Sequence, residues 1–213
     1  VQTCALPICE VVQSMRGLPV TIRTIDIGAD KPLDAVHTEH LGNHAPTNPA
    51  LGLRAIRWCL AEPAMFQTQI KALLRAAAHG RIKVLIPMLA HESEIKQSLL
   101  QIDRARVVLD AQGFAYGDID IGAMIEIPAA ALIVPTFLKY FDFLSIGTND
   151  LIQYTLAVDR ADETVSHLYD GTHPAVQFLI KSTIEQCVAA KKEVSVCGEM
   201  AGDVNHADRK SVV

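Results

Sequence analysis

Short apolar runs alternate with helix-like stretches along the chain, and this alternation limits the fold more than any other feature. Five runs have the composition of buried strands, and a helix-like segment separates each run from the next. These runs are 20–27, 82–89, 121–127, 143–146 and 194–197. Continuous apolar strands that are joined through helices are typical of a parallel sheet covered by helices. The pattern therefore predicts an α/β protein.

The helix starts and ends can be read in the same way. Asn48 and Pro49 are typical of a helix start, because asparagine caps a first turn and proline is tolerated within it. We expect further helices over about 64–78 and 174–191. No composition shift or linker divides the chain, so the sequence predicts one domain over residues 10–206.

The two ends do not follow this pattern. Residues 1–9 have no periodicity, and residues 207–213 form a polar tail after the last strand and loop. We expect both ends to be non-native or disordered, with ordinary frayed termini as the alternative.

Charge and composition exclude several classes of function. The net charge is −5, and the chain has no basic block of the kind that a nucleic-acid surface needs. No apolar run reaches the roughly 20 residues of a membrane span. The five cysteines are scattered and odd in number, which is a poor disulfide framework. We expect a cytoplasmic protein with reduced thiols.

Oxygen-bearing side chains follow two successive strand-like runs. Glu126 lies near the end of the run 121–127, and Asn149 and Asp150 come directly after the next run. A carboxylate among apolar residues is costly unless it is paired or bound to a metal. Two carboxylates and an amide suit Mg²⁺. A helix-capping role for Asn149 or Asp150 and a salt bridge for Glu126 explain the spacing equally well.

Three arginines and one cysteine are further candidates. Arg23 lies in a strand-like run, Arg54 one turn into an expected helix, and Arg160 in a polar loop. Guanidinium groups suit phosphate and carboxylate, although ordinary ion pairs are their commoner role. Cys197 ends a strand-like run beside a glycine, where a thiol can donate a proton. A lone cysteine is also a common small core residue.

Five stretches carry a resemblance to a known family. They are IRTIDIGADKP (22–32), NPALGLRAIR (48–57), GAMIEIPAA (122–130), FLSIGTNDLIQYTLAVDR (143–160) and VCGEMAGD (196–203). In this order they resemble the phosphoenolpyruvate-utilising enzymes, and most of all the enzyme I group of the bacterial sugar phosphotransferase system. The resemblance implies a TIM-type (β/α)8 barrel, of which about five βα units are present here.

The resemblance also implies roles for individual residues. Glu126 and Asp150 match ligands of Mg²⁺, and Asn149 and Asp150 match substrate contacts. Cys197 matches the cysteine that handles the proton at the enolate carbon of pyruvate. Three residues match arginines that hold the phosphate and carboxylate of phosphoenolpyruvate: Arg23, Arg54 and Arg160.

The family reaction and its partners are implied in the same way. Phosphoenolpyruvate gives its phosphoryl group to a histidine on a mobile domain and leaves as pyruvate. The group then passes to a histidine-containing phosphocarrier protein during sugar transport, and the parent enzyme is a homodimer. The Gly-Gly-x-Thr-Ser-His type motif of the phosphohistidine is absent here. We therefore expect an internal fragment that is inactive in phosphotransfer when alone.

Two other interpretations remain. The chain also resembles pyruvate phosphate dikinase and phosphoenolpyruvate synthase, which share the barrel but phosphorylate a different acceptor. The stretch TLAVDRAD (155–162) favours the enzyme I group. A non-catalytic barrel remnant, used for binding or dimerisation, is the alternative from a different class.

Overall fold

The computed structural model describes residues 2–27 and 48–202. The described residues form two compact units. The first unit takes residues up to 88 together with 93–119, and the second takes 89–92 and residues from 120 onward.

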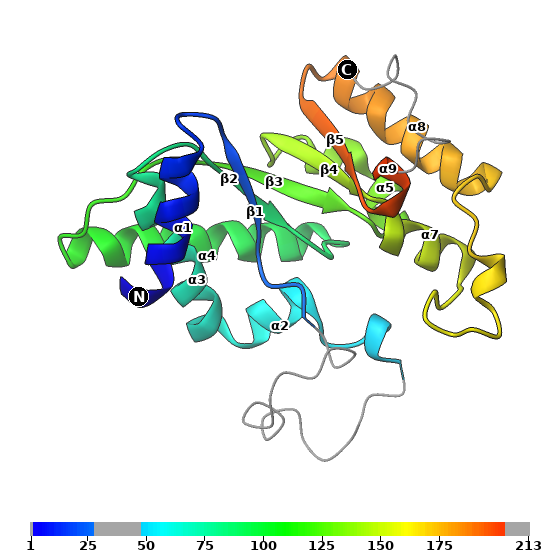
Figure 1. Ribbon diagram of the computed structural model, residues 1–213, viewed down its shortest axis with the longest axis horizontal. Coiled ribbons are helices and arrows are strands. Elements are labelled where there is room, and N and C mark those ends of the chain that lie inside the picture. Colours follow the sequence, from blue (N-terminus) through cyan, green and yellow to red (C-terminus); the bar gives the residue numbers. More distant parts are fainter. Residues whose placement is uncertain (1, 28–47, 203–213) are drawn as a thin grey trace. The chain divides into compact units, whose positions relative to one another are not determined.

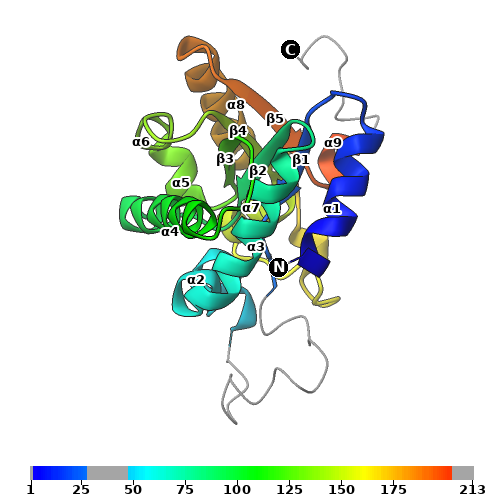
Figure 2. The same cartoon turned by 90° about the vertical axis from the view of Figure 1, so that its left-hand side faces the viewer.

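In the first unit, a parallel strand pair is covered by helices. Strand β1 pairs in parallel with β2, with Val20 opposite Ile82 and Arg23 opposite Leu85. Helix α1 packs against α3, as Figure 2 shows. The elements of this unit are α1 (Gln2–Ser14), β1 (Val20–Arg23), η2 (Pro49–Leu51), α2 (Ala55–Ala61), α3 (Pro63–Ala77), β2 (Ile82–Ile86) and α4 (Glu92–Ala111).

In the second unit, three parallel strands lie in sequence order. Strand β4 pairs with β3 on one side and with β5 on the other. Helix α8 lies beside β5 (Figure 1). It also packs against α5 and α6. The elements are β3 (Ile119–Ile125), α5 (Pro128–Leu132), α6 (Val134–Phe137), β4 (Phe143–Gly147), α7 (Thr148–Leu156), η3 (Ser166–Leu168), α8 (Pro174–Ala189), β5 (Glu193–Cys197) and α9 (Glu199–Gly202).

Local sequence explains where these elements lie. All residues of β2 and of β4 are buried, so both faces of these strands are covered, as their continuous apolar runs predict. Helices α3, α5 and α8 begin at Pro63, Pro128 and Pro174, where a missing N–H removes no helical hydrogen bond.

The predicted α/β class with parallel strands is confirmed. Five strands occur in the described residues, each within a few residues of its predicted run. The eightfold closed barrel remains a prediction.

The helix start expected at Asn48 is wrong, although a helix, α2, is present over Ala55–Ala61. Pro49–Leu51 form only a 3-10 turn, and the side chain of Asn48 makes no capping hydrogen bond. Arg54 has extended backbone angles, φ −140° and ψ 162°, and α2 begins after it at Ala55. Arg54 is therefore not inside a helix, because the chain leaves the helical conformation at Gly52, where ψ is −144°.

A helix, α1, covers Gln2–Ser14, where residues 1–9 show no periodicity. Its Val12 is buried, and the helix packs on α3, so tertiary contacts support it. The expectation that residues 1–9 are non-native stays a prediction, and residues 207–213 lie outside the described residues. None of the helices in the described part of the chain is long and apolar enough to cross a membrane.

Candidate functional site

In the second unit, polar side chains gather where the three strands end. Glu126 follows β3 directly, Asn149 and Asp150 lie in the first turn after β4, and Cys197 is the last residue of β5. The strands are parallel, so their carboxyl ends form one edge. This edge is where α/β proteins place their active sites. The structure thus brings these four predicted residues to one edge.

Glu126 is buried, with 1% of its surface exposed, and a glycine on the next strand makes room for it. A Cβ atom at Gly147 would lie 2.8 Å from Glu126 Oε2 and 2.9 Å from Met124 Sδ. An alanine at this position would therefore require the side chains of Glu126 and Met124 to shift. The glycine at the end of β4 therefore leaves space for the side chain of Glu126, the candidate metal ligand.

Helix α7 starts directly after β4, and its first turn is tied to the next strand. The side chain of Asn149 accepts a hydrogen bond at Oδ1 from the Glu199 backbone N–H, at 3.0 Å. No side chain caps α7, so Asn149 does not have the capping role that the sequence left open. Asp150 lies half-buried in the first turn, where a negative charge is favoured by the helix dipole.

The thiol of Cys197 is half-buried and hydrogen-bonded. Ser145 Oγ donates to Cys197 Sγ at 3.4 Å, and Sγ donates to the Ile146 carbonyl oxygen at 3.3 Å. Thr148 Oγ1 donates to the Cys197 carbonyl oxygen at 2.8 Å. A fully buried core role does not describe this cysteine.

Tyr169, which no sequence pattern singled out, connects several of these residues. Its hydroxyl donates to the Asn149 carbonyl oxygen at 3.1 Å. Burial raises the pKa of Tyr169, and the negative charges of Glu199 and Asp150 raise it further, while Arg160 lowers it. Arg160, an exposed loop residue, therefore lies near the same tyrosine as Asp150. A tyrosine in a polar loop carries no spacing signal that could have revealed this.

In the first unit, Arg23 and Arg54 share one carboxylate. Asp26 Oδ2 lies 2.8 Å from Arg23 Nη1, and Asp26 Oδ1 lies 3.0 Å from Arg54 Nη2. The side chains of Asp26 and Arg54 are 3% and 5% exposed, whereas that of Arg23 is 44% exposed. Sequence reasoning missed Asp26, although it lies within the motif IRTIDIGADKP. Both arginines therefore form ion pairs, which was the alternative to a role in ligand binding. The exposed part of the Arg23 side chain can still bind an anion.

The donor set is consistent with a hard cation. Glu126, Asp150 and Asn149 offer carboxylate and amide oxygens, and Mg²⁺ uses one or two carboxylates while keeping water and substrate oxygens as its other ligands. Within residues 2–27 and 48–202, no cluster of three or more His, Cys, Asp or Glu could hold a metal. Glu126 and Asp150 are two carboxylates, the number that a Mg²⁺ site completed by water and substrate oxygens uses.

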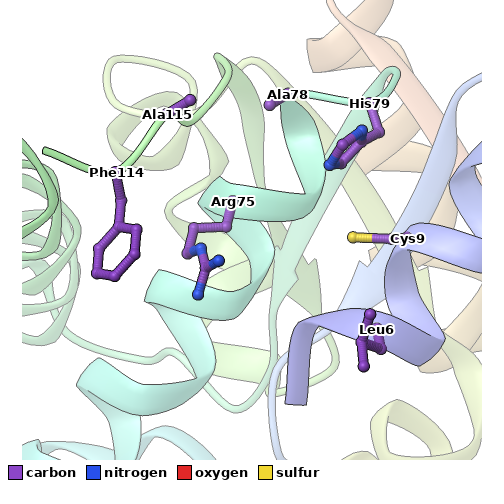
Figure 3. A pocket seen from close by; sticks show the side chains of 7 residues that line it. All are labelled: Leu6, Cys9, Arg75, Ala78, His79, Phe114 and Ala115. Carbon is purple, nitrogen blue, oxygen red and sulfur yellow. The ribbon is translucent and has the colours of Figure 1, made fainter. Parts of the chain in front are cut away.

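A cavity of about 550 Å³ is lined by residues of the first unit. Arg75 stacks over the ring of Phe114, 4.5 Å from its centre, and Leu6 and Cys9 of α1 form the opposite wall (Figure 3). None of the predicted site residues lines this cavity. Leu6 and Cys9 belong to the segment that is predicted to be non-native, so we assign the cavity no function.

The fold and the strand-end residues define a class: a parallel α/β domain with carboxylate, amide and thiol side chains at the carboxyl ends of its strands, where such folds place active sites. The family model described as PEP-utilising enzyme, PEP-binding domain matches residues 3–208. The chain belongs to this family.

Similar proteins agree with this family. A phosphoenolpyruvate-protein phosphotransferase from Cupriavidus necator is 62% identical over 193 residues, which are 90% of this chain and 32% of that protein. One from Streptococcus equinus is 47% identical and covers 91% of this chain and 33% of that protein. The chain thus spans about a third of the length of these relatives. Among solved structures, a citrate lyase from Burkholderia xenovorans LB400 has a TM-score of 0.48 at 20% identity, over 62% of this chain and 40% of that chain.

Proposed function

We propose that this chain is the phosphoenolpyruvate-binding part of a phosphoenolpyruvate-protein phosphotransferase. The observation that carries the proposal is the 62% identity to the Cupriavidus necator protein over 90% of the chain. The gathering of Glu126, Asn149, Asp150 and Cys197 at one strand edge supports it, since these residue types are the ones that such a reaction needs.

In this proposal, Glu126 and Asp150 hold Mg²⁺, and Asn149 contacts the substrate beside it. Mg²⁺ supplies charge stabilisation for the transferring phosphoryl group. Glu126 suits the role because its buried carboxylate has a low-dielectric surrounding, in which an opposite charge is strongly attracted. The bond from Asn149 Oδ1 to the Glu199 backbone fixes the amide, so its orientation is set before substrate arrives.

The three arginines hold the anionic groups of phosphoenolpyruvate. Asp26 fixes the Arg54 guanidinium in a buried position and also contacts Arg23, whose exposed part remains available to phosphate or carboxylate. Arg160 serves the same purpose from the loop after α7, where Gln153 Oε1 accepts a hydrogen bond from its backbone N–H at 3.2 Å. Cys197 donates the proton that converts enolpyruvate to pyruvate.

The phosphoryl acceptor is a histidine on a domain that these residues do not contain. From there the group passes to a histidine-containing phosphocarrier protein. The parent enzyme is a cytoplasmic homodimer of a sugar transport system, and the present chain alone is inactive in phosphotransfer. Support for these steps comes from the names of the relatives and from the family resemblance.

Calorimetric titration with phosphoenolpyruvate in the presence of Mg²⁺ tests the binding part of the proposal. We expect binding at up to millimolar ligand, lost without Mg²⁺ and weakened at least tenfold by Asp150→Asn. Asp120→Asn removes an exposed carboxylate at the opposite end of β3, so it serves as the matched control and leaves binding unchanged. Absence of binding in a folded wild-type chain would favour a non-catalytic remnant and contradict the proposal.

The dikinase-type alternative shares the family model and predicts the same binding. The Cupriavidus necator and Streptococcus equinus proteins both carry the phosphotransferase name, which favours a histidine acceptor on a carrier route. Phosphoryl transfer from the full-length parent to a histidine-containing carrier protein, which the dikinase-type alternative does not predict, distinguishes the two.

A further inference from the structure

A layer of hydroxyl groups lies one step below the strand edge that carries Cys197. In the strand register, Ser145 lies opposite Met124 on one side and Ser195 on the other, and Gly147 lies opposite Cys197. Side chains two residues apart on a strand point to the same face. Ser145 and Ser195 therefore share the face of Cys197, one layer deeper along their strands.

The hydroxyls of this layer form a directed chain that ends on sulfur. Ser195 Oγ donates to Ser145 Oγ at 3.0 Å, and Ser145 Oγ donates to Cys197 Sγ at 3.4 Å. Each serine has one hydroxyl proton. Because Ser145 accepts from Ser195, its own proton is directed toward sulfur. Ser145 is only 4% exposed, so bulk water competes little for this contact.

We propose that Ser145 is a positioning residue for Cys197, and that Ser195 orients Ser145 for this purpose. The inference rests on the proposed function, in which Cys197 protonates enolpyruvate. In that step the S–H bond breaks, and its electron pair stays on sulfur as a thiolate. The electron pair of the C=C bond forms the new C–H bond, and the enolate C–O bond becomes the carbonyl of pyruvate.

Ser145 acts on both sides of this step. Before it, the Ser145 hydroxyl and the Ile146 carbonyl oxygen fix the thiol between two partners, one donor and one acceptor. After it, the thiolate keeps the Ser145 donor, and a hydrogen bond to a charged acceptor is stronger than one to a neutral acceptor. Proton loss from sulfur is therefore favoured by a group that never contacts the substrate.

Other titratable groups lie at the strand ends or on helices that pack near them. Glu126 follows β3, Asp150 lies on α7 and Glu199 on α9, and Cys187 is a buried thiol on α8, which packs against β5. All four remain in every variant described below. Their effect on sulfur is therefore common to the wild type and the variants.

The pH dependence of alkylation tests the proposal. The chain is treated with iodoacetamide between pH 6 and 10, and Cys197 is followed by mass spectrometry in the tryptic peptide 193–209, which contains no other cysteine. For Ser145→Ala we expect the pH midpoint to rise by about 0.5 to 1 unit, because the thiolate loses a donor. Below the midpoint, this makes alkylation about three- to tenfold slower. Ser195→Ala shifts the midpoint the same way by a smaller amount.

Ser182→Ala is the matched control, because Ser182 lies on α8 and accepts a hydrogen bond from Gln186 of the same helix. It leaves the midpoint at the wild-type value. Burial raises the pKa of Cys59 to about 12 and that of Cys187 to about 11, so slow alkylation of these two thiols verifies that each variant is folded.

Wild-type midpoints in Ser145→Ala and Ser195→Ala overturn the proposal. If Ser145→Ala does not fold, the midpoint of Ser195→Ala decides the question. The measurement uses no phosphoenolpyruvate, so its failure is distinct from failure of the proposed function, which the titration of the wild-type chain with phosphoenolpyruvate tests.

Discussion

Asp26 shows how one buried residue can organise two distant parts of the chain. Its two carboxylate oxygens contact Arg23, on β1, and Arg54, which precedes α2. Removing one partner from a buried ion pair is strongly destabilising. The arginines that we propose for substrate binding therefore depend on a residue that need not touch the substrate.

Asp26→Asn tests this dependence. We expect a loss of about 3–5 kcal/mol in the free energy of unfolding, because the buried Arg54 loses its carboxylate. Asp103→Asn removes the exposed partner of Arg106 and costs less than about 1 kcal/mol. Urea denaturation of both variants gives the comparison, and equal losses would show that Asp26 has no special role.

Gly147→Ala tests the space around Glu126. The added Cβ lies 2.8 Å from Glu126 Oε2, so the carboxylate must move. We expect a destabilisation of about 1–3 kcal/mol from overpacking, together with loss of Mg²⁺-dependent binding of phosphoenolpyruvate. At Gly202 a Cβ meets nothing within 4 Å, so Gly202→Ala is the control and retains binding. Binding is measured by calorimetry. Normal binding by Gly147→Ala would contradict the proposal that Glu126 is a ligand of Mg²⁺.

At the scale of elements, α7 connects the ends of β4 and β5. Thr148, its first residue, is fully buried and donates to the Cys197 carbonyl oxygen, while Asn149 accepts from the start of α9. A further close approach occurs at Gly198, whose φ of +102° favours glycine and whose Cβ would lie 2.4 Å from Thr148 Oγ1. The start of α7 and the end of β5 therefore pack closely, with a glycine at 198 and hydrogen bonds from Thr148 and to Asn149 at the contact.

Thr148→Val removes this connection with almost no change in shape. The Cys197 carbonyl oxygen loses the hydrogen bond from Thr148, and we expect a cost of about 1–3 kcal/mol in unfolding free energy. In Thr155→Val, on the same helix, the lost bond is to the carbonyl four residues earlier and adds little stability, so the change is within about 0.5 kcal/mol. Thermal or urea unfolding of the two variants measures the difference, and a match between them would contradict the role of Thr148.

At the scale of the whole molecule, the chain spans about a third of the relatives it matches. Its motifs resemble the substrate-binding motifs of the enzyme I group, but none of its histidines lies in a Gly-Gly-x-Thr-Ser-His context. Binding and transfer are therefore expected to separate experimentally.

This separation gives a direct prediction. With radiolabelled phosphoenolpyruvate and Mg²⁺, the isolated chain acquires no acid-labile phosphate, whereas the full-length parent becomes labelled. The physical reason is that the histidine proposed as the phosphoryl acceptor lies outside this chain. Labelling of the isolated chain would show that one of its own eight histidines accepts the group.

Much of the fold could be predicted because its signals are local. Runs of apolar residues located all five strands, and the helices expected over about 64–78 and 174–191 correspond to α3 and α8. The start at Asn48 was misread, because a capping pair followed by Gly52 permits only one turn. The family motifs located Glu126, Asp150 and Cys197 at strand ends, and the structure places them there.

The sequence by itself determined the order of strands and helices and the residue types at the strand ends, since both follow from neighbouring residues. Only the tertiary structure decided which residues meet. Asp26 meets Arg54 across 28 positions, Tyr169 meets Asn149 across 20, and Ser145 meets Cys197 across 52. Such contacts depend on strand register and loop path, which no local pattern specifies. The hydroxyl chain that ends on Cys197 exists because parallel pairing puts Ser145 opposite Ser195.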